Sequence, residues 1–167
     1  GVRDGLFILP GTHSKWAWVR DGRVTRFQSF MTGEFFALLS QHSLLARTID
    51  TAAAFDPQAF TLGVARAGQG GSLLHNAFGT RTLALMARMD AGPLASYLSG
   101  LVIGEELHDN ALADIRDVVL IGSENLTRRY ALAFETLNIS ARRMGAEATW
   151  AGLHALGQHL PAERSPR

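Results

Sequence analysis

Short apolar runs separated by polar turns open the chain. Leu6–Leu9 and Trp16–Val19 are apolar runs of strand length, and Arg23–Phe30 mixes polar and apolar side chains at strand length. Asp21-Gly22, which lies between the last two runs, is typical of a two-residue hairpin turn. The pattern predicts three strands, with the second and third paired antiparallel.

The next segment has apolar side chains at helical spacing, namely Phe35, Leu38, Leu39, Leu44 and Leu45. They predict a helix over 33–46. Thr32 is expected to be its N-cap, with Glu34 in the first turn, where the helix dipole favours a carboxylate. Asp56-Pro57 predicts the start of a short helix, and the glycines of 68–71 predict its end.

Residues 72–113 predict two or three further helices. The first has a predicted apolar face made of Leu73, Leu74, Ala77 and Phe78. Gly92-Pro93 is expected to separate it from a long helix over about 94–112. Gly100 and Gly104 lie on one face of that long helix, where they would let another element approach closely.

Strands and helices alternate in the last part of the chain. Asp117–Ile121 is a continuous run typical of a buried parallel strand, and a helix is expected to follow over 125–137. Ile139–Met144 predicts a last strand and Ala146–His159 a last helix. The order β-β-β-α, helical insert, β-α-β-α predicts an α/β domain whose mixed sheet has helices on both faces.

Composition narrows the class of protein. With 167 residues, 47% of them hydrophobic, the chain is large enough for one domain with a sizeable core. A net charge of +1 argues against nucleic-acid binding, and the doublets Arg128-Arg129 and Arg142-Arg143 are expected to be solvated. No apolar run reaches the roughly 18–20 residues of a membrane span, and no signal peptide is visible. A cytoplasmic location is compatible with this composition.

The residues give little support for a directly bound metal. The chain has no cysteine, which leaves no thiol nucleophile and no cysteine-based zinc site. Glu105-x-x-His108 resembles half of a di-iron helix signature, but no second carboxylate–histidine pair completes it.

The turn Pro10–Lys15 is the first candidate for ligand chemistry. Its last four side chains can all donate hydrogen bonds, and Lys15 is the only lysine among 16 lysines and arginines. Successive backbone N–H groups, hydroxyls and one compact cation suit a phosphate group. An ordinary exposed hairpin turn is the alternative for the same residues.

A second candidate follows the predicted strand Asp117–Ile121. Gly122-Ser123 lies between this strand and a helix N-terminus, which is where open α/β sheets place their ligands. An ordinary strand-to-helix turn, with Ser123 as cap, is the alternative.

Three stretches, LPGTHSKW, FMTGEFFALLSQHSLL and YLSGLVIGEEL, are together similar to the 2-dehydro-3-deoxygalactonokinase family. The similarity extends through FGTRTL, VVLIGSENLTRRY and the final helix. It implies a ribonuclease H-like, actin-like ATPase domain over residues 1–160. The helices predicted above form an insert in this domain over about 50–113, and the polar residues 161–167 are expected to be a tail. Because family members are longer and this chain starts at Gly1, we expect the N-terminal half of the family, with the catalytic base, to be absent.

The resemblance implies a sugar-acid kinase of galactonate catabolism. Such an enzyme transfers the γ-phosphoryl group of ATP, bound with Mg²⁺, to the 6-hydroxyl of 2-dehydro-3-deoxy-D-galactonate, and a homodimer is one expected assembly. This chain alone is expected to be inactive. Two alternatives are a nucleotide-dependent sensor of the same fold and a folded fragment that serves only as an interaction domain.

The resemblance also implies roles for individual residues. The expected phosphate-binding residues are Gly11, Thr12, His13, Ser14 and Lys15. The expected residues on the adenosine side are Gly122, Ser123 and Leu126. The candidates for contact with substrate or Mg²⁺-bound water are Thr32, Glu34, Arg81 and Glu106. Helix capping is the alternative role for Thr32 and Glu34, and a solvated position is the alternative for Arg81.

Overall fold

A five-stranded sheet organises the protein, whose computed structural model describes residues 3–109, 112 and 117–159. The strands are β1 (Gly5–Leu9), β2 (Ser14–Arg20), β3 (Arg23–Phe30), β4 (Val118–Ile121) and β5 (Ala141–Met144). They lie in the order β3-β2-β1-β4-β5, with β1 antiparallel to β2 and parallel to β4. The sheet is therefore mixed and has β1 and β4 in its interior, which confirms that part of the prediction.

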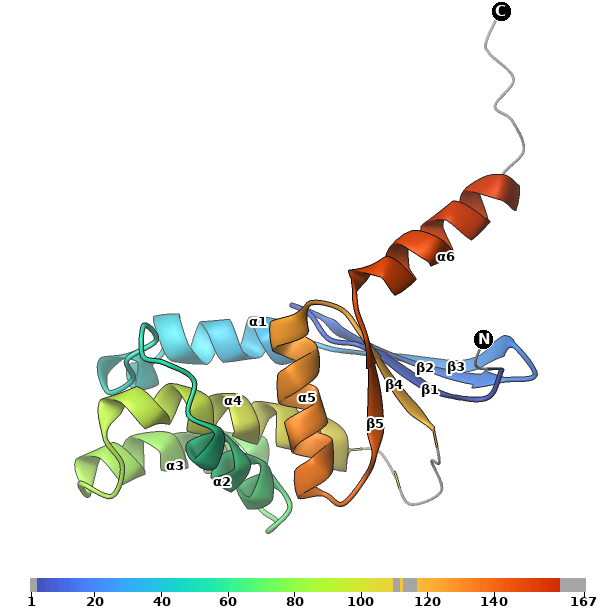
Figure 1. Cartoon of the computed structure of the whole chain (residues 1–167). Coiled ribbons are helices and arrows are strands. Elements are labelled where there is room, and N and C mark those ends of the chain that lie inside the picture. Colours follow the sequence, from blue (N-terminus) through green and yellow to red (C-terminus); the bar gives the residue numbers. More distant parts are fainter. Residues whose placement is uncertain (1–2, 110–111, 113–116, 160–167) are drawn as a thin grey trace, which may run out of the picture.

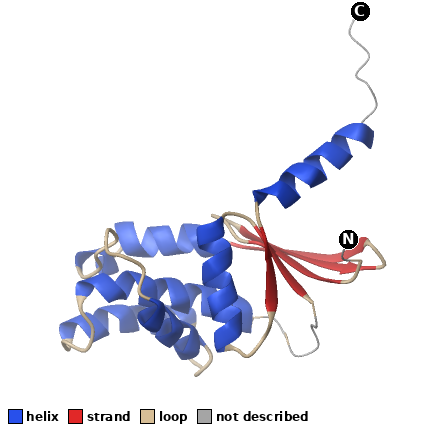
Figure 2. Cartoon of the chain, viewed as in Figure 1, coloured by secondary structure: helices blue, strands red, loops and turns tan. Residues whose placement is uncertain are grey.

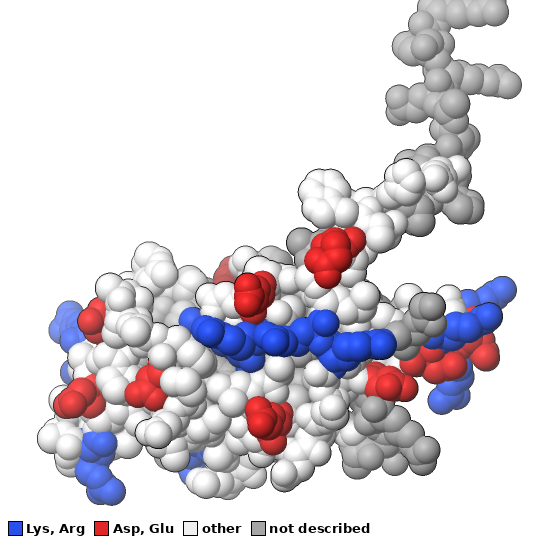
Figure 3. All heavy atoms as spheres, in the orientation of Figure 1, with Lys and Arg blue, Asp and Glu red and all other residues white. Residues whose placement is uncertain are grey.

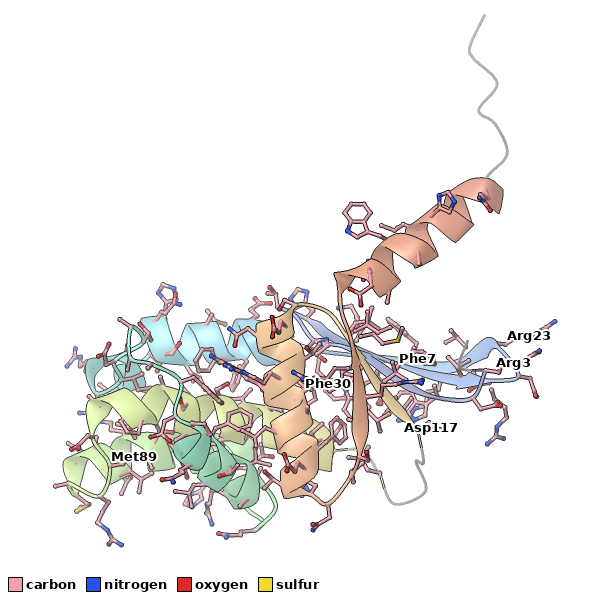
Figure 4. All side chains as sticks on the ribbon, viewed as in Figure 1. Arg3, Phe7, Arg23, Phe30, Met89 and Asp117 are labelled. Carbon is pink, nitrogen blue, oxygen red and sulfur yellow. The ribbon has the colours of Figure 1, made fainter. Side chains whose placement is uncertain are left out.

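The turn between β2 and β3 is formed by Asp21 and Gly22, whose φ angles are 53° and 72°. Positive φ at both central residues is the geometry of a type I′ turn, whose twist matches that of the paired strands. This hairpin, predicted from the sequence, is confirmed. It lies at the end of the sheet remote from the helices, where Figure 4 labels Arg3 and Arg23.

The helical elements are α1 (Thr32–Ala37), a π-helical segment (Leu38–His42), a 3₁₀ helix (Leu44–Arg47), α2 (Pro57–Ala67), α3 (Leu73–Leu85), α4 (Ala91–His108), α5 (Glu124–Thr136) and α6 (Ala146–His159). The start of α2 follows the predicted signal, because the Asp56 side chain accepts the backbone N–H groups of Gln58 and Ala59. The predicted tail over 161–167 lies outside the described residues.

The single helix predicted over 33–46 is wrong, because the chain breaks at Ser43. Its hydroxyl donates to the Leu39 carbonyl at 2.6 Å and accepts the Leu45 N–H at 3.0 Å. Ser43 itself is extended, with φ −100° and ψ 177°. A serine side chain that bonds the nearby backbone competes with the helical ladder, and here the competition ends the helix.

Helices α3 and α4 also differ from their predicted form. The predicted apolar face of α3 is only partly buried, since Leu74 is 81% and Phe78 55% exposed. The other two residues of this face, Leu73 and Ala77, do pack against α4. Pro93, expected to lie between two helices, is in the first turn of α4, where a proline is tolerated.

Helices α2, α4 and α5 pack on one face of the sheet (Figure 1 and Figure 2). The buried side chains of this core are Leu6, Ile8, Trp16, Val118 and Leu120 from the sheet, Phe60, Val64, Ile103, Leu107, Tyr130, Ala133 and Phe134 from the helices, and Leu112. Helix α6 rises on the other side of the sheet and approaches β4, with Trp150 left 71% exposed. The two faces are therefore covered unevenly.

Glycines allow α2 and α4 to pack with their backbones in contact. A Cβ atom on Gly100 would lie 2.0 Å from the carbonyl oxygen of Phe60, and one on Gly63 would lie 2.1 Å from that of Tyr97. At Gly104 it would lie 2.8 Å from the Cβ of Ala67. The close approach predicted from Gly100 and Gly104 is confirmed, and the approaching element is α2.

We expect Gly100→Ala to lower the free energy of unfolding by at least about 1–3 kcal/mol, the usual cost of overpacking a close contact. Gly79→Ala on α3 is the matched control, because its methyl group would meet nothing within 4 Å. That control should raise stability by about 0.5–1 kcal/mol through helix propensity. Chemical denaturation measures both, and equal stability of Gly100→Ala and wild type would contradict the α2–α4 contact.

Candidate nucleotide site and the buried carboxylate behind it

The turn between β1 and β2 is shorter than the sequence predicted. Ser14 and Lys15 belong to β2, and Lys15 pairs with Leu9 across the ladder. The turn proper therefore spans residues 10–13. Strand alternation then sends the Ser14 side chain to the interior, where it is fully buried, and leaves Lys15 half-buried on the other face.

The start of α1 lies directly against this turn. The Glu34 N–H donates to the Thr12 carbonyl at 2.9 Å, and the Glu34 carboxylate pairs with His13 Nε2 at 2.6 Å. Gly33 has no room for a side chain, because a Cβ atom there would lie 2.5 Å from the carbonyl oxygen of Gly11. The turn is therefore held by α1 through backbone contact and the hydrogen bond between His13 and Glu34, in addition to its own strands.

The polar groups of the turn divide into two sets. Thr12 and His13 are exposed, and Lys15 Nζ donates to the His13 carbonyl at 3.0 Å. The Ser14 hydroxyl instead donates at 2.7 Å to Glu106 on α4, inside the protein. The predicted phosphate-binding roles stay predictions, but Ser14 uses its hydroxyl inward.

Glu106 is a carboxylate that is only 4% exposed and accepts four hydrogen bonds. Oε1 accepts from Ser14 Oγ at 2.7 Å and from Trp16 Nε1 at 2.5 Å, and Oε2 accepts from Tyr130 Oη at 2.6 Å and from the Thr32 hydroxyl. A buried charge is costly unless it is paired or hydrogen-bonded, and these four donors meet that requirement. Phe30, labelled in Figure 4, packs beside them, with its ring 5.6 Å from that of Trp16.

This network overturns the capping role expected of Thr32. The N-cap of α1 is Met31, which makes no side-chain capping bond, and Thr32 is the first helical residue. The Thr32 hydroxyl donates a hydrogen bond to Glu106 instead. A charged carboxylate forms stronger hydrogen bonds than neutral groups do. Its predicted contact with substrate or Mg²⁺-bound water stays a prediction.

Burial and the neighbouring Glu106 carboxylate raise the pKa of Tyr130 well above its ordinary value of 10.0. Loss of the phenolic proton would place a second negative charge beside Glu106 and remove one of the hydrogen bonds that Glu106 accepts. Tyr130 is therefore a proton-bearing donor over the physiological range.

The second predicted turn opens into a cavity of about 600 Å³ at the carboxyl ends of β4 and β5. Its lining residues are Gly122, Ser123, Glu124, Thr127, Arg143, Met144 and Gly145. The cavity borders the first turn, since a Cβ atom on Gly122 would lie 3.6 Å from the carbonyl oxygen of Pro10. The structure thus brings the two predicted turns together at one edge of the sheet.

The structure separates the remaining candidates. Thr32 and Glu106 line a cavity of about 360 Å³ with Glu105 and Asp109, whereas Leu126 is outside the lining of the Gly122 cavity. Arg81 on α3 is elsewhere and donates to the Leu44 carbonyl at 3.3 Å.

Arg143 is a lining residue that sequence reasoning missed. Arg142 and Arg143 are both exposed, as expected, but β5 runs parallel to β4, so its end meets the Gly122 turn and Arg143 lines the cavity there. The topological rule for parallel strands could have found it. Figure 3 shows basic side chains gathered over α5 and β5, and these elements carry the doublets Arg128-Arg129 and Arg142-Arg143.

The sequence model of the family described as 2-keto-3-deoxy-galactonokinase matches residues 1–156. The chain belongs to this family. A probable 2-dehydro-3-deoxygalactonokinase of Rhizobium meliloti (strain 1021) is 36% identical, over 96% of this chain and 54% of the relative. The 2-dehydro-3-deoxygalactonokinase of Escherichia coli (strain K12) is 28% identical, over 90% of this chain and 52% of the relative.

The family fold is also found among solved structures. A crystal structure of a candidate 2-dehydro-3-deoxygalactonokinase from Sinorhizobium meliloti matches with a TM-score of 0.85 at 35% identity, over 95% of this chain and 55% of that one. This chain therefore spans about half the length of the curated relatives it matches.

The two candidate carboxylates of this galactonokinase-family chain, Glu34 and Glu106, already have partners within the protein. Each Glu106 oxygen already accepts two hydrogen bonds, and Glu34 is paired with His13. Over residues 3–109, 112 and 117–159, no three His, Cys, Asp or Glu side chains gather as a metal site would require.

Among the same residues, no helix is both long and apolar enough to cross a bilayer.

A further cavity, of about 480 Å³, lies between α2, α3 and α4. Its polar lining includes Arg66, His75, Asn76 and Tyr97. None of its lining residues belongs to either turn.

We expect Tyr130→Phe to reduce the loss of stability at alkaline pH. The raised pKa of folded Tyr130 contributes stability that is complete below the unfolded value, near pH 10, and is lost as the pH rises from there toward the folded pKa. Phenylalanine removes this contribution and costs about 1–3 kcal/mol at neutral pH for the lost donor. Denaturation midpoints measured from neutral pH to above pH 10 test it, and the same alkaline slope in both proteins would contradict it.

Proposed function

We propose that this chain is the nucleotide-binding part of a sugar-acid kinase that transfers the γ-phosphoryl group of ATP to the 6-hydroxyl of 2-dehydro-3-deoxy-D-galactonate. One observation carries the proposal. The two turns expected to receive phosphates and adenosine are adjacent, with the Gly122 Cβ position 3.6 Å from the Pro10 carbonyl oxygen. Membership of the galactonokinase family supports the substrate class.

In this proposal the first turn holds the β- and γ-phosphates. The backbone of Gly11 and Thr12, the Thr12 hydroxyl and the Lys15 ammonium supply donors and one positive charge, and the His13–Glu34 pair steadies the turn. Phosphoryl transfer asks of a protein mainly positioning and charge stabilisation, and this turn supplies both. Mg²⁺ would arrive on the nucleotide phosphates, where it neutralises developing charge.

The cavity after β4 takes the adenosine side. Gly122 and Ser123 lie at its entrance from the strand, and Arg143 lines it from β5. The order of the strands and the two adjacent turns support a ribonuclease H-like, actin-like ATPase domain with its helical insert over about 50–113. A cytoplasmic location and a homodimer are further expectations of the proposal.

The catalytic base is assigned to the part of the enzyme that relatives have in addition to this chain. The chain covers 54% and 52% of its curated relatives. Within the described residues, Glu106 is committed to hydrogen bonds and Glu34 to His13, which leaves neither as a suitable base for the sugar hydroxyl.

We expect this chain alone to show no measurable kinase turnover. Without the remaining half, the sugar hydroxyl cannot be held in line with the γ-phosphoryl group, and such positioning supplies about 7–11 kcal/mol of the barrier reduction. A coupled assay for ADP formation with Mg·ATP and the sugar acid tests this. Robust sugar-acid phosphorylation by the purified chain would contradict it, whereas binding of Mg·ATP agrees with it.

We expect Lys15→Met to lower kcat/KM for ATP by about 10²–10³ in a protein that joins this chain to the half its relatives carry. This corresponds to about 3–4 kcal/mol, the usual cost of removing one stabiliser of transition-state charge. Lys15→Arg should restore activity only in part, because a planar guanidinium is not a compact point charge.

The matched control is Arg20→Met, which removes a positive charge from the other, exposed end of the same strand. It should leave the kinetics within a few-fold, and the KM for the sugar acid should stay similar in all these variants. Near-normal kinetics of Lys15→Met would contradict the phosphate-binding role and leave the turn as an ordinary hairpin turn.

A further inference from the structure

Glu106 connects three elements that surround the proposed phosphate site. Its Oε1 accepts hydrogen bonds from Ser14 and Trp16 on β2, and these two residues flank Lys15 in the sequence. Its Oε2 accepts from Thr32 and Tyr130, which lie on α1 and α5. One carboxylate is thereby bonded to the strand that leaves the turn, to the helix that braces the turn and to the helix that starts at the second turn.

Stability alone does not account for this arrangement. A buried charge with its partners is often no more stabilising than well-packed apolar residues of the same volume. What the carboxylate does provide is geometry, because four charge-assisted hydrogen bonds are satisfied only when β2, α1 and α5 stand in one relative position.

We propose that Glu106 is a positioning residue that sets the conformation of the phosphate turn through Ser14. This rests on the proposed nucleotide site. With the Ser14 hydroxyl held 2.7 Å from Glu106, strand alternation directs Lys15 to the opposite face, and the Thr12–Ser14 backbone is fixed against the start of α1. Ser14 then serves the site by anchoring the turn and not by touching the phosphate.

The proposal also explains why α4 reaches the sheet at this point. Glu106 lies near the C-terminal end of α4, whose glycines hold it against α2. The hydrogen bond between Glu106 and Ser14 therefore links the position of these helices directly to the position of the turn. Small displacements of catalytic donors cost large factors in affinity or rate, so this coupling has a measurable effect.

The test uses Glu106→Gln in this chain. Glutamine keeps the shape, and the hydroxyls of Ser14, Thr32 and Tyr130 can rotate to donate or accept, so the fold should be kept. The hydrogen bonds lose their charge assistance, however. We expect the Kd for Mg·ATP to rise about tenfold and hydrogen exchange of the backbone amides of residues 11–15 to accelerate, with exchange unchanged in the parts of the chain that Glu106 does not contact.

Two further variants make the test specific. Glu105→Gln changes the same charge one residue earlier, where the carboxylate accepts from Asn76 at 3.0 Å, and it should leave both readouts at wild-type values. Ser14→Ala removes only the link between the carboxylate and the turn, and it should reproduce the Glu106→Gln effects. The double variant Ser14→Ala/Glu106→Gln should have the same Kd for Mg·ATP as the single variant that binds less tightly. Both changes act on the same hydrogen bond between Glu106 and the turn, so their effects should not add.

The outcomes separate the two proposals. If wild type fails to bind Mg·ATP, the proposed function is overturned, while exchange at residues 11–15 still decides the role of Glu106. If wild type binds and Glu106→Gln binds equally well with unchanged exchange, the positioning role is overturned. Uniform acceleration of exchange over the whole chain, or additive effects in the double variant, would make Glu106 a structural support only and also overturn it. Should Glu106→Gln not fold, Ser14→Ala against Glu105→Gln gives the same decision.

Discussion

The buried carboxylate of Glu106 is the constraint on which the rest of the site depends. Taking an ionised carboxylate out of water costs several kcal/mol unless its oxygens are fully bonded. Here the donors come from residues 14, 16, 32 and 130, so β2, α1 and α5 must all be in place together. One carboxylate thereby links the sheet to α1, which packs against the first turn, and to α5, which follows the second turn.

Much of the fold was predictable where the deciding interactions are local. The Asp21-Gly22 hairpin follows from two positive φ angles that these residues tolerate, and the start of α2 follows from Asp56 and Pro57. The close approach at Gly100 and Gly104 was also predictable, because only the absence of a side chain is needed. Local residue types also pointed to the two turns of the candidate site, which the structure brings together.

The errors occur where a distant partner decides. Thr32 was predicted to cap α1, but its hydroxyl bonds a carboxylate 74 residues away, and Ser14 bonds the same group across 92 residues. Arg143 is exposed, as predicted, but its place in the Gly122 cavity follows only from the pairing of β5 with β4. Of the apolar face predicted on α3, Leu73 and Ala77 pack against α4, whereas Leu74 and Phe78 are exposed. Local sequence patterns contain no signal for these long-range hydrogen bonds, and only the topology of the parallel strands points to Arg143.

The claim that the two turns form one nucleotide site is tested most directly by mapping backbone amide shifts as this chain is titrated with Mg²⁺ and a non-hydrolysable ATP analogue. The account predicts saturable shifts that are largest at residues 11–15, 122–124 and 143–145 and that share one Kd. Shifts confined to the cavity lined by Arg66, His75 and Tyr97, or separate Kd values for the two turns, would contradict it.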